Sequence, residues 1–172
     1  MKYIYLFLFL ILFSNTFCMD NQNSIEDKQP KKDSFFIKGD TNKITLSETQ
    51  WKNLLSPDVY AIAREKGTER PFTGKYWNHF ELGTYKCAAC GNLLFKSNAK
   101  FESSCGWPSF FEPVNKGSII YQPDNTLGMI RTEVKCGRCD AHLGHVFEDG
   151  PKPTGLRYCI NSGVIEFEKV KN

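Results

Sequence analysis

The sequence predicts a mainly β domain that carries a short helical region on its N-terminal side. Three observations favour this class. Aromatic residues make up 14% of the chain, which suits a packed β-rich interior. From Gly83 onward, short apolar runs are separated by turn-forming residues, as expected for a series of short strands. Ahead of these runs, two helix-start signals follow one another closely.

Residues 1–18 are typical of an export signal or an N-terminal anchor. Lys2 precedes an apolar run at 3–13, and small polar residues follow that run. A membrane-spanning helix needs roughly 20 apolar residues, which is more than this run supplies. Cys18 could instead carry a lipid, and an uncleaved anchor is a third alternative. We therefore expect an exported protein, in a periplasm or a secretory compartment, that is either released or held at a membrane by its N-terminus.

The remaining chain divides into a polar linker at 19–43 and one folded domain at 44–170. The linker is rich in Asn, Gln, Lys and Asp. The folded part is long enough to bury a core of its own. The formal net charge of +3 is small and evenly spread, which argues against a nucleic-acid partner. We expect a monomer.

Two short helices are predicted at the start of the folded domain. Ser47 and Gln50 form a capping box, which predicts a helix over 47–55. The Ser-Pro pair that follows repeats the start signal, because proline favours the first helical position. The second helix is predicted over 56–66, with Gly67 as its stop.

Short strands are predicted from Gly83 to the end of the domain, each bounded by turn residues. The last of them shows partial alternation of apolar and charged residues, which suits a half-buried strand. The expected strands cover 84–86, 93–95, 118–121, 129–135, 145–147, 157–161 and 164–168.

Two Cys-x-x-Cys pairs, separated by 45 residues, predict a structural zinc site. A two-residue spacer in a tight turn lets two thiolates point at one ion, and two such turns supply a tetrahedral shell. Two local disulfides or a redox-active pair are the alternatives. We expect one structural Zn²⁺ per chain, held by Cys87, Cys90, Cys136 and Cys139.

Two cysteines of the folded domain are left over, and both have surroundings that suit chemistry. Cys159 lies on a predicted strand, where Arg157 and Asn161 project to the same face. A neighbouring cation favours a thiolate, although a buried, inert thiol is an equally good interpretation of this strand. Cys105 lies in a loop containing Gly and Pro, where it could move to meet a second thiol or remain a passive surface residue.

Three further side chains are candidates. His142 and His145 follow the last cysteine of the predicted zinc site, but four thiolates already complete that site. The two imidazoles are then free for acid–base work, or are structural turn residues. Trp107 beside the Cys105 loop could form an apolar wall for a substrate methyl group or pack in the core.

Several stretches together resemble one family. The residues at 101–110, 135–150 (KCGRCDAHLGHVFEDG) and 157–162 (RYCINS), with the PFTG segment at 71–74, are similar to B-type peptide-methionine sulfoxide reductases. These enzymes reduce the R epimer of methionine sulfoxide. The resemblance covers about 47–167. It implies two antiparallel sheets packed as a small β-sandwich, short N-terminal helices and a structural zinc site.

The resemblance also implies roles for individual residues. Cys159 would attack the sulfoxide and become a sulfenic acid, and Cys105 would resolve it as a disulfide. A thioredoxin-like reductant would then restore both thiols. The substrate would be oxidised methionine, protein-bound or free. The implied substrate-binding residues are Trp107, His142, His145, Asp149, Arg157 and Asn161.

Two other functions compete with this one. A zinc-ribbon-like binding module without catalysis would use the four paired cysteines but leave Cys105 and Cys159 without a role. A thiol–disulfide exchanger would use those two thiols but would be indifferent to sulfoxides.

Overall fold

The computed structural model describes residues 42–170. The predicted export signal and nearly all of the predicted linker lie outside these residues. The described chain begins with two α-helices, α1 (Glu48–Leu54) and α2 (Pro57–Ala63), and continues as short strands. No helix between residues 42 and 170 is long and apolar enough to cross a bilayer.

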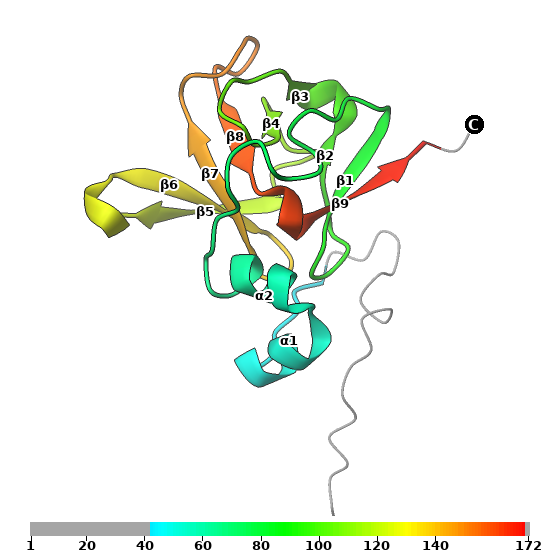
Figure 1. Ribbon diagram of the computed structural model, residues 1–172, viewed down its shortest axis with the longest axis vertical. Coiled ribbons are helices and arrows are strands. Elements are labelled where there is room, and N and C mark those ends of the chain that lie inside the picture. The colour runs from blue at the N-terminus through cyan, green and yellow to red at the C-terminus, as the bar shows by residue number, and fades with distance from the viewer. Residues whose placement is uncertain (1–41, 171–172) are drawn as a thin grey trace, which may run out of the picture.

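The strands form two antiparallel sheets, and this confirms the predicted fold class (Figure 1). The smaller sheet has the order β2 (Leu93–Lys96), β1 (Gly83–Cys87) and β9 (Ile165–Lys169). The larger sheet has the order β3 (Lys100–Phe101), β4 (Ser109–Phe110), β8 (Arg157–Ile160), β7 (His142–Phe147), β6 (Arg131–Cys136) and β5 (Ile119–Asp124).

Aromatic side chains join the two sheets. Phe95 of β2 stacks on Phe110 of β4, with ring centroids 4.3 Å apart and planes inclined by 15°. Tyr85 of β1 meets the same Phe110 ring edge-on at 5.0 Å. All three rings are fully buried, so the high aromatic content of the chain is used as the core between the sheets.

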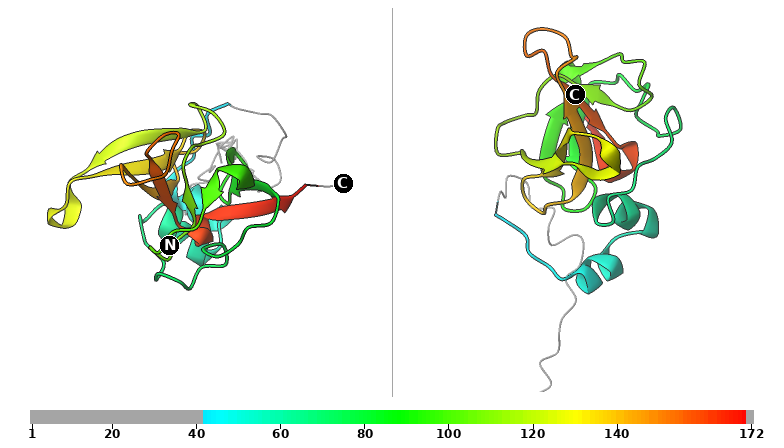
Figure 2. Two further views of the ribbon diagram at one scale, coloured as in Figure 1. Left: turned by 90° about the horizontal axis from the view of Figure 1, so that it is seen from above. Right: turned by 90° about the vertical axis from the view of Figure 1, so that its left-hand side faces the viewer.

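The hairpin of β5 and β6 extends away from the rest of the domain, on the side opposite β9 (Figures 1 and 2). Its tip is the 3₁₀ turn η3 (Thr126–Gly128). Leu127 and Ile130 at this tip are 85% and 94% exposed. Only the base of the hairpin therefore contributes to the core.

The first helix is confirmed, and the second ends earlier than predicted. Ser47 caps α1, and its capping box with Gln50 is complete. The last residue of α2 is Ala63, and Lys66 rather than Gly67 takes the left-handed conformation, with φ of 58°. The Nζ atom of Lys66 lies 2.8 Å from Glu133 Oε2, so an ion pair to the sheet stabilises this turn.

The predicted strands all fall on observed ones, with ends that differ by a few residues. The end of β5 and the start of β7 differ most, by three residues each, and the start of β7 at His142 places both histidines on one strand. The strands β3 and β4 were not predicted, because two residues are too short to show a period.

Candidate active site and metal centre

The register of the larger sheet places two of the predicted site residues, Cys159 and His145, in one row with Ser109 and Glu133. Ser109 of β4 lies opposite Cys159 of β8, Cys159 lies opposite His145 of β7, and His145 lies opposite Glu133 of β6. Residues directly opposite in antiparallel strands share a face. The other face of β8 carries Tyr158 and Ile160, which are buried in the core.

The next row on the same face lies two residues further along each strand. It contains Arg157 opposite Phe147, and Asp124 opposite Arg131. The pairing of Thr132 with Val146 places Arg131 beside Phe147, so the row is continuous across four strands. Arg157 covers the Phe147 ring, with its guanidinium carbon 4.5 Å from the ring centre.

A small hollow of about 130 Å³ is lined by two residues from each of these rows and by four others. This volume matches about four water molecules, so it suits the end of one side chain rather than a large ligand. Its lining combines one thiol, an aromatic wall and several polar groups. The lining residues are Thr68, Trp107, Arg131, Gly144, His145, Phe147, Cys159 and Asn161.

Four of the eight predicted catalytic and substrate-binding residues line this hollow, namely Cys159, Trp107, His145 and Asn161.

Gly144 lies between the two histidines of β7 and approaches β8 closely. A Cβ on it would lie 2.0 Å from the Cys159 carbonyl oxygen, and its φ is +154°. Only glycine allows this approach.

The second unpaired cysteine lies against the first. The Sγ atoms of Cys105 and Cys159 are 3.8 Å apart, and both residues are partly buried. The β3–β4 loop carries Cys105, and it returns to the sheet at Ser109, the cross-strand neighbour of Cys159. Gly106 has φ of +87°, and a Cβ there would meet Phe72 N at 2.8 Å, so glycine is required for this loop.

The pKa values of the two thiols are shifted in opposite directions. A hydrogen bond with Cys159, followed by contacts with Ser103, Ser109 and the Trp107 carbonyl, lowers the pKa of Cys105 to about 4. The same hydrogen bond and burial raise the pKa of Cys159, against the attraction of Arg157. The pair therefore loses one proton readily and the second with difficulty. Any movement of Cys105 away from Cys159 removes the largest cause that holds the Cys159 thiol protonated.

Arg157 and Asp149, both predicted to bind substrate, form an ion pair with each other beside the hollow. Arg157 Nε and Nη2 each donate to a different Asp149 carboxylate oxygen at 2.8 Å. This two-pronged contact lowers the pKa of Asp149. It also fixes the guanidinium over Phe147, so Arg157 acts as a wall and a source of positive potential near Cys159.

His145 is held from the β5–β6 hairpin. Its Nε2 atom lies 2.7 Å from Asp124 Oδ2, and the same oxygen accepts a hydrogen bond from Arg131 Nη2 at 2.6 Å. The hydroxyl and the backbone N–H of Thr126 donate to the other Asp124 oxygen. Thr126 contributes first, and His145 and Arg131 further, to lowering the pKa of Asp124. This carboxylate thus orients two residues of the hollow.

His142 lies behind the hollow, where it is 3% exposed. Its Nδ1 lies 2.7 Å from Oε1 of the buried Glu133, whose Oε2 also contacts Lys66. Burial lowers the pKa of His142, although Glu133 opposes this effect. A neutral imidazole with Nδ1–H bound to the carboxylate leaves Nε2 as an acceptor, and this atom has no hydrogen-bond partner among the described residues.

One residue of the connector after α2 joins several parts of the site. The backbone carbonyl of Glu69 accepts a hydrogen bond from the indole N–H of Trp107 at 3.1 Å. The backbone N–H of Glu69 donates to Asn161 Oδ1 at 3.2 Å. Its carboxylate accepts the backbone N–H groups of Ser162 at 2.6 Å and Gly163 at 2.9 Å. Glu69 therefore holds the aromatic wall, the amide and the chain that follows Cys159.

The four paired cysteines meet in a separate, fully buried cluster. Their Sγ atoms all lie within 4.8 Å of one another. The Cys87–Cys139 and Cys90–Cys136 separations are 3.8 and 3.7 Å. A tetrahedron with Zn–S bonds of about 2.3 Å has edges of about 3.8 Å, whereas a disulfide bond is about 2.05 Å long. The residues therefore fit a tetrahedral metal ion and are positioned to bind one.

Both Cys-x-x-Cys turns have the same backbone geometry. In the first, Cys87 N donates to Asn92 O and Gly91 N donates to Cys87 O, each at 2.8 Å. In the second, Cys136 N donates to Ala141 O at 2.8 Å and Asp140 N donates to Cys136 O at 3.0 Å. Gly91 and Asp140 occupy equivalent left-handed positions. The repeated turn explains how two distant segments present matching pairs of thiols.

The four neighbouring thiols shift one another's pKa values in opposite directions. Hydrogen bonding to Cys136 raises the pKa of Cys87, while hydrogen bonding to Cys139 lowers that of Cys136. Four neighbouring thiolates repel one another unless a positive ion lies between them. A metal ion would bind all four sulfurs and stabilise the fold, and four sulfur ligands leave no open coordination position for catalysis.

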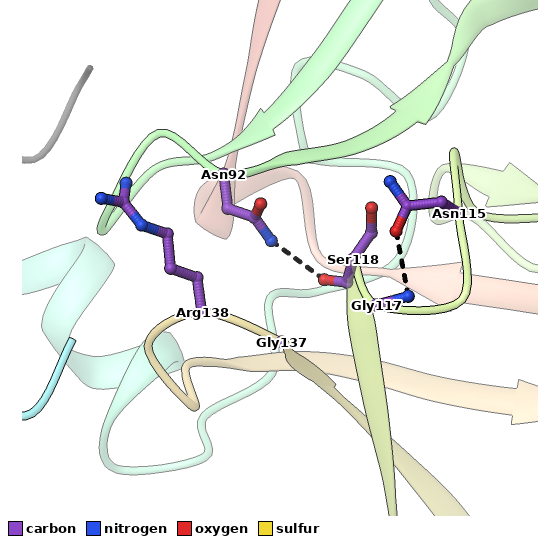
Figure 3. A pocket seen from close by; sticks show the side chains of 6 residues that line it. All are labelled: Asn92, Asn115, Gly117, Ser118, Gly137 and Arg138. Atoms are coloured by element: carbon purple, nitrogen blue, oxygen red, sulfur yellow. Dashed lines mark hydrogen bonds between the residues drawn. The ribbon is translucent and has the colours of Figure 1, made fainter. Parts of the chain in front are cut away.

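A second hollow, of about 220 Å³, lies beside this cluster and is shown in Figure 3. Two of its polar side chains form hydrogen bonds to nearby backbone groups. Asn92 Nδ2 donates to Ser118 O at 3.0 Å, and Asn115 Oδ1 accepts from Gly117 N at 2.9 Å. Its lining contains no thiol, histidine or carboxylate, so the catalytic candidate is the hollow at Cys159.

Sequence reasoning missed Thr68, Glu69, Asp124, Arg131 and Phe147. Phe147 shares a strand with His145 and sits at an even spacing from it, so the period of β7 could have suggested it. Thr68 and Glu69 precede the PFTG segment that carried part of the resemblance. Asp124 and Arg131 lie on the far hairpin, and only the sheet order brings them to Cys159.

The fold and the site together are those of a thiol-containing oxidoreductase class: a strand cysteine and a loop cysteine meet beside a hollow, and four other cysteines form a separate cluster that could bind a metal. Residues 55–169 match the SelR domain family. The chain is 56% identical over 128 residues to a protein of Agrobacterium fabrum named peptide methionine sulfoxide reductase MsrB, covering 74% of this chain and 95% of that protein.

Two further relatives carry the same name. The Teredinibacter turnerae protein is 58% identical over 122 residues, covering 71% of this chain and 90% of the relative. The Thiobacillus denitrificans protein is 58% identical over 121 residues, covering 70% and 92%. The chain belongs to the B-type methionine sulfoxide reductase family.

Proposed function

We propose that the protein reduces the R epimer of methionine sulfoxide to methionine, with Cys159 as the nucleophile and Cys105 as the resolving thiol. The observation that carries this proposal is the position of Cys159 in the wall of the hollow, with a second thiol 3.8 Å away. Family membership supports the reaction class, and the site geometry supports the roles of the residues.

In the first step, the Cys159 thiolate attacks the sulfoxide sulfur and the oxygen is transferred. Cys159 becomes a sulfenic acid and the substrate leaves as the thioether, with one proton taken up on the transferred oxygen. Trp107 and Phe147 supply an apolar wall for the substrate methyl group. His145 and Asn161 lie beside the reacting sulfur, where they can hold a water molecule or donate to the oxygen.

In the second step, Cys105 attacks the sulfenic acid. A Cys105–Cys159 disulfide forms and one water molecule leaves. The sulfur atoms are already in contact, so a small displacement of the loop brings them to bonding distance. A thioredoxin-like dithiol then reduces this disulfide by exchange and becomes oxidised itself.

The metal in the four-cysteine site is inferred to be Zn²⁺. Four thiolates in a tetrahedral arrangement favour this ion, and a closed shell suits a structural role. When bound, it holds the two Cys-x-x-Cys turns together and takes no part in the redox steps.

Export remains an inference from residues 1–18, since a short apolar run after a single lysine is typical of a signal. The mass of the mature N-terminus distinguishes cleavage, lipid attachment at Cys18 and an uncleaved anchor.

The test of this function uses zinc-loaded, fully reduced protein mixed with one equivalent of N-acetyl-methionine-R-sulfoxide methylamide. The expected result is one equivalent of the thioether and the loss of two free thiols. The S epimer is the matched control and should leave both unchanged. A non-catalytic binding module would lose no thiols, and a thiol–disulfide exchanger would ignore both sulfoxides. Either result would overturn the proposal.

A further inference from the structure

We propose that Arg131 binds the main-chain carbonyl oxygen of the methionine sulfoxide residue and so sets how deeply its side chain enters the hollow. This inference rests on the proposed function, because it assigns a substrate contact within that site. Arg131 lines the hollow together with Cys159 but belongs to β6, on the opposite side from the reactive pair.

The position of Arg131 separates it from the reacting atoms. His145 is the direct cross-strand neighbour of Cys159, whereas Arg131 lies two strands and two residues away from it. With strands about 4.8 Å apart and a rise of about 3.4 Å per residue, the Cα atoms of Cys159 and Arg131 are separated by about 12 Å. A sulfoxide oxygen next to Cys159 therefore meets His145 and Asn161 first. The guanidinium reaches the part of the substrate that lies further from the sulfur.

The guanidinium is held in place and retains a free donor. Arg131 Nη2 donates to Asp124 Oδ2 at 2.6 Å, and Asp124 is itself fixed by Thr126. Arg131 Nε is shielded from solvent and has no hydrogen-bond partner among residues 42–170. An atom this enclosed is out of reach of a ligand. Nη1 is not among the buried atoms and makes no hydrogen bond within the described part of the chain, so it is the donor that can reach a group bound in the hollow.

The charge at this position favours a neutral acceptor. Arg131 is paired with Asp124, and Arg157 with Asp149, so each cation at the hollow already has a carboxylate partner. A free carboxylate would have to compete with Asp124 for Arg131. A peptide carbonyl accepts from the remaining donor without displacing the ion pair. The acceptor is therefore the carbonyl of a substrate within a chain, rather than the carboxylate of the free amino acid.

The first experiment needs no variant. Wild-type enzyme is compared on N-acetyl-methionine-R-sulfoxide methylamide and on the R epimer of N-acetyl-3-(methylsulfinyl)propylamine, which has the same side chain and acetamide but no main-chain carbonyl beyond Cα. The analogue should show a KM about tenfold higher at a similar kcat, as expected for loss of a hydrogen bond to a charged donor. Equal KM values would overturn the role of Arg131. Failure to reduce either compound would instead overturn the proposed function.

The second experiment tests whether Arg131 makes the contact with the carbonyl oxygen. Arg131→Met should raise KM for the methylamide about tenfold, with kcat within about twofold, and should leave KM for the carbonyl-free analogue unchanged. Arg131→Lys should give an intermediate KM. An equal penalty on both compounds would show that Arg131 acts on the fold or on Cys159 rather than on the carbonyl.

Lys135→Met is the matched control. Lys135 lies on the same strand and contacts a β5 side chain, Gln122, at 3.2 Å, but does not line the hollow. This variant should leave KM unchanged for both compounds. Free methionine-R-sulfoxide forms a third arm. A loss in Arg131→Met confined to this carboxylate substrate would overturn the assignment to a carbonyl.

Discussion

Two groups of cysteines in this domain have almost the same spacing and opposite surroundings. In the four-cysteine cluster the Cys87–Cys139 and Cys90–Cys136 Sγ distances are 3.8 and 3.7 Å, and the Cys105–Cys159 distance is 3.8 Å. The four-cysteine cluster is buried and formed by two rigid turns of equal geometry. The pair is partly buried, and one member lies on a loop beside a hollow. Distance alone therefore does not decide what a thiol does. Burial, the number of sulfurs and the position on a paired turn or on a loop instead separate a cluster suited to metal binding from a pair suited to the proposed redox chemistry.

Substitution at the redox pair should separate activity from stability. Cys159→Ser is expected to lower sulfoxide reduction by about 10³-fold or more, because a hydroxyl is a poor nucleophile for this reaction. The melting temperature should stay within about 3 °C, since the change conserves volume at a partly buried position. Steady-state assays with a dithiol reductant and thermal unfolding measure the two effects. Activity within about tenfold of the wild type would show that Cys159 is not the nucleophile.

Substitution in the four-cysteine cluster should do the reverse. Cys87→Ser, or removal of the metal with a strong chelator, is expected to lower the melting temperature by more than about 10 °C, because structural metal binding contributes directly to folding. Metal analysis should show loss of one ion per chain. Cys105→Ser is the control and should retain both the ion and the melting temperature. A chelated protein that melts at the same temperature would contradict the structural role of the metal.

Loss of the Glu69 carboxylate, which holds the chain that follows Cys159, should have an intermediate effect. Glu69→Ala removes the acceptors of two backbone N–H groups, which should cost about 2 kcal/mol of unfolding free energy. It should also lower kcat/KM about tenfold, because the segment that orients Trp107 and Asn161 is loosened. Glu69→Gln keeps one acceptor and should recover part of both losses, and Glu65→Ala, on an exposed neighbour, should change neither. Wild-type kcat/KM in Glu69→Ala would show that this residue does not position the site.

The smallest expected effect is a shift in the protonation of the pair. In Cys159→Ala, Cys105 loses the hydrogen bond that is the first cause of its low pKa, so its pKa should rise from about 4 toward the usual range. In Cys105→Ala, the first cause raising the pKa of Cys159 is lost, so that pKa should fall. Alkylation rates of the metal-loaded variants, measured against pH, report both values. If the pH profiles of alkylation in both variants matched those of the same cysteines in the wild type, the two thiols would not share a proton.

The sequence predicts candidate residues from local patterns better than it predicts which distant segments meet. Cys-x-x-Cys spacing and local turn signals identify the metal site, because each pair is defined by neighbouring residues. The alternation of β8 also places Arg157 and Cys159 on one face, as observed. Residues that act from distant segments could not be found in this way.

Asp124 and Arg131 show why. They belong to a hairpin that meets the reactive strand only through the order β8-β7-β6-β5, and no local period predicts which strands become neighbours. His142 shows a different limit. Its spacing from His145 suggested a shared role, but the irregular pairing of β6 with β7 near Lys135 leaves it behind the hollow and bonded to Glu133. Its predicted contact with substrate, like those of Asp149 and Arg157, remains a prediction.

The most direct test of the division between the two cysteine groups is to map the disulfides after one turnover. Metal-loaded protein is reacted with one equivalent of the R-sulfoxide, alkylated under denaturing conditions, digested and analysed by mass spectrometry, with the metal content measured in parallel. The account predicts a single Cys105–Cys159 disulfide, four alkylated cysteines from the metal site and one retained ion per chain. A disulfide that includes Cys87, Cys90, Cys136 or Cys139, with loss of the ion, would contradict it.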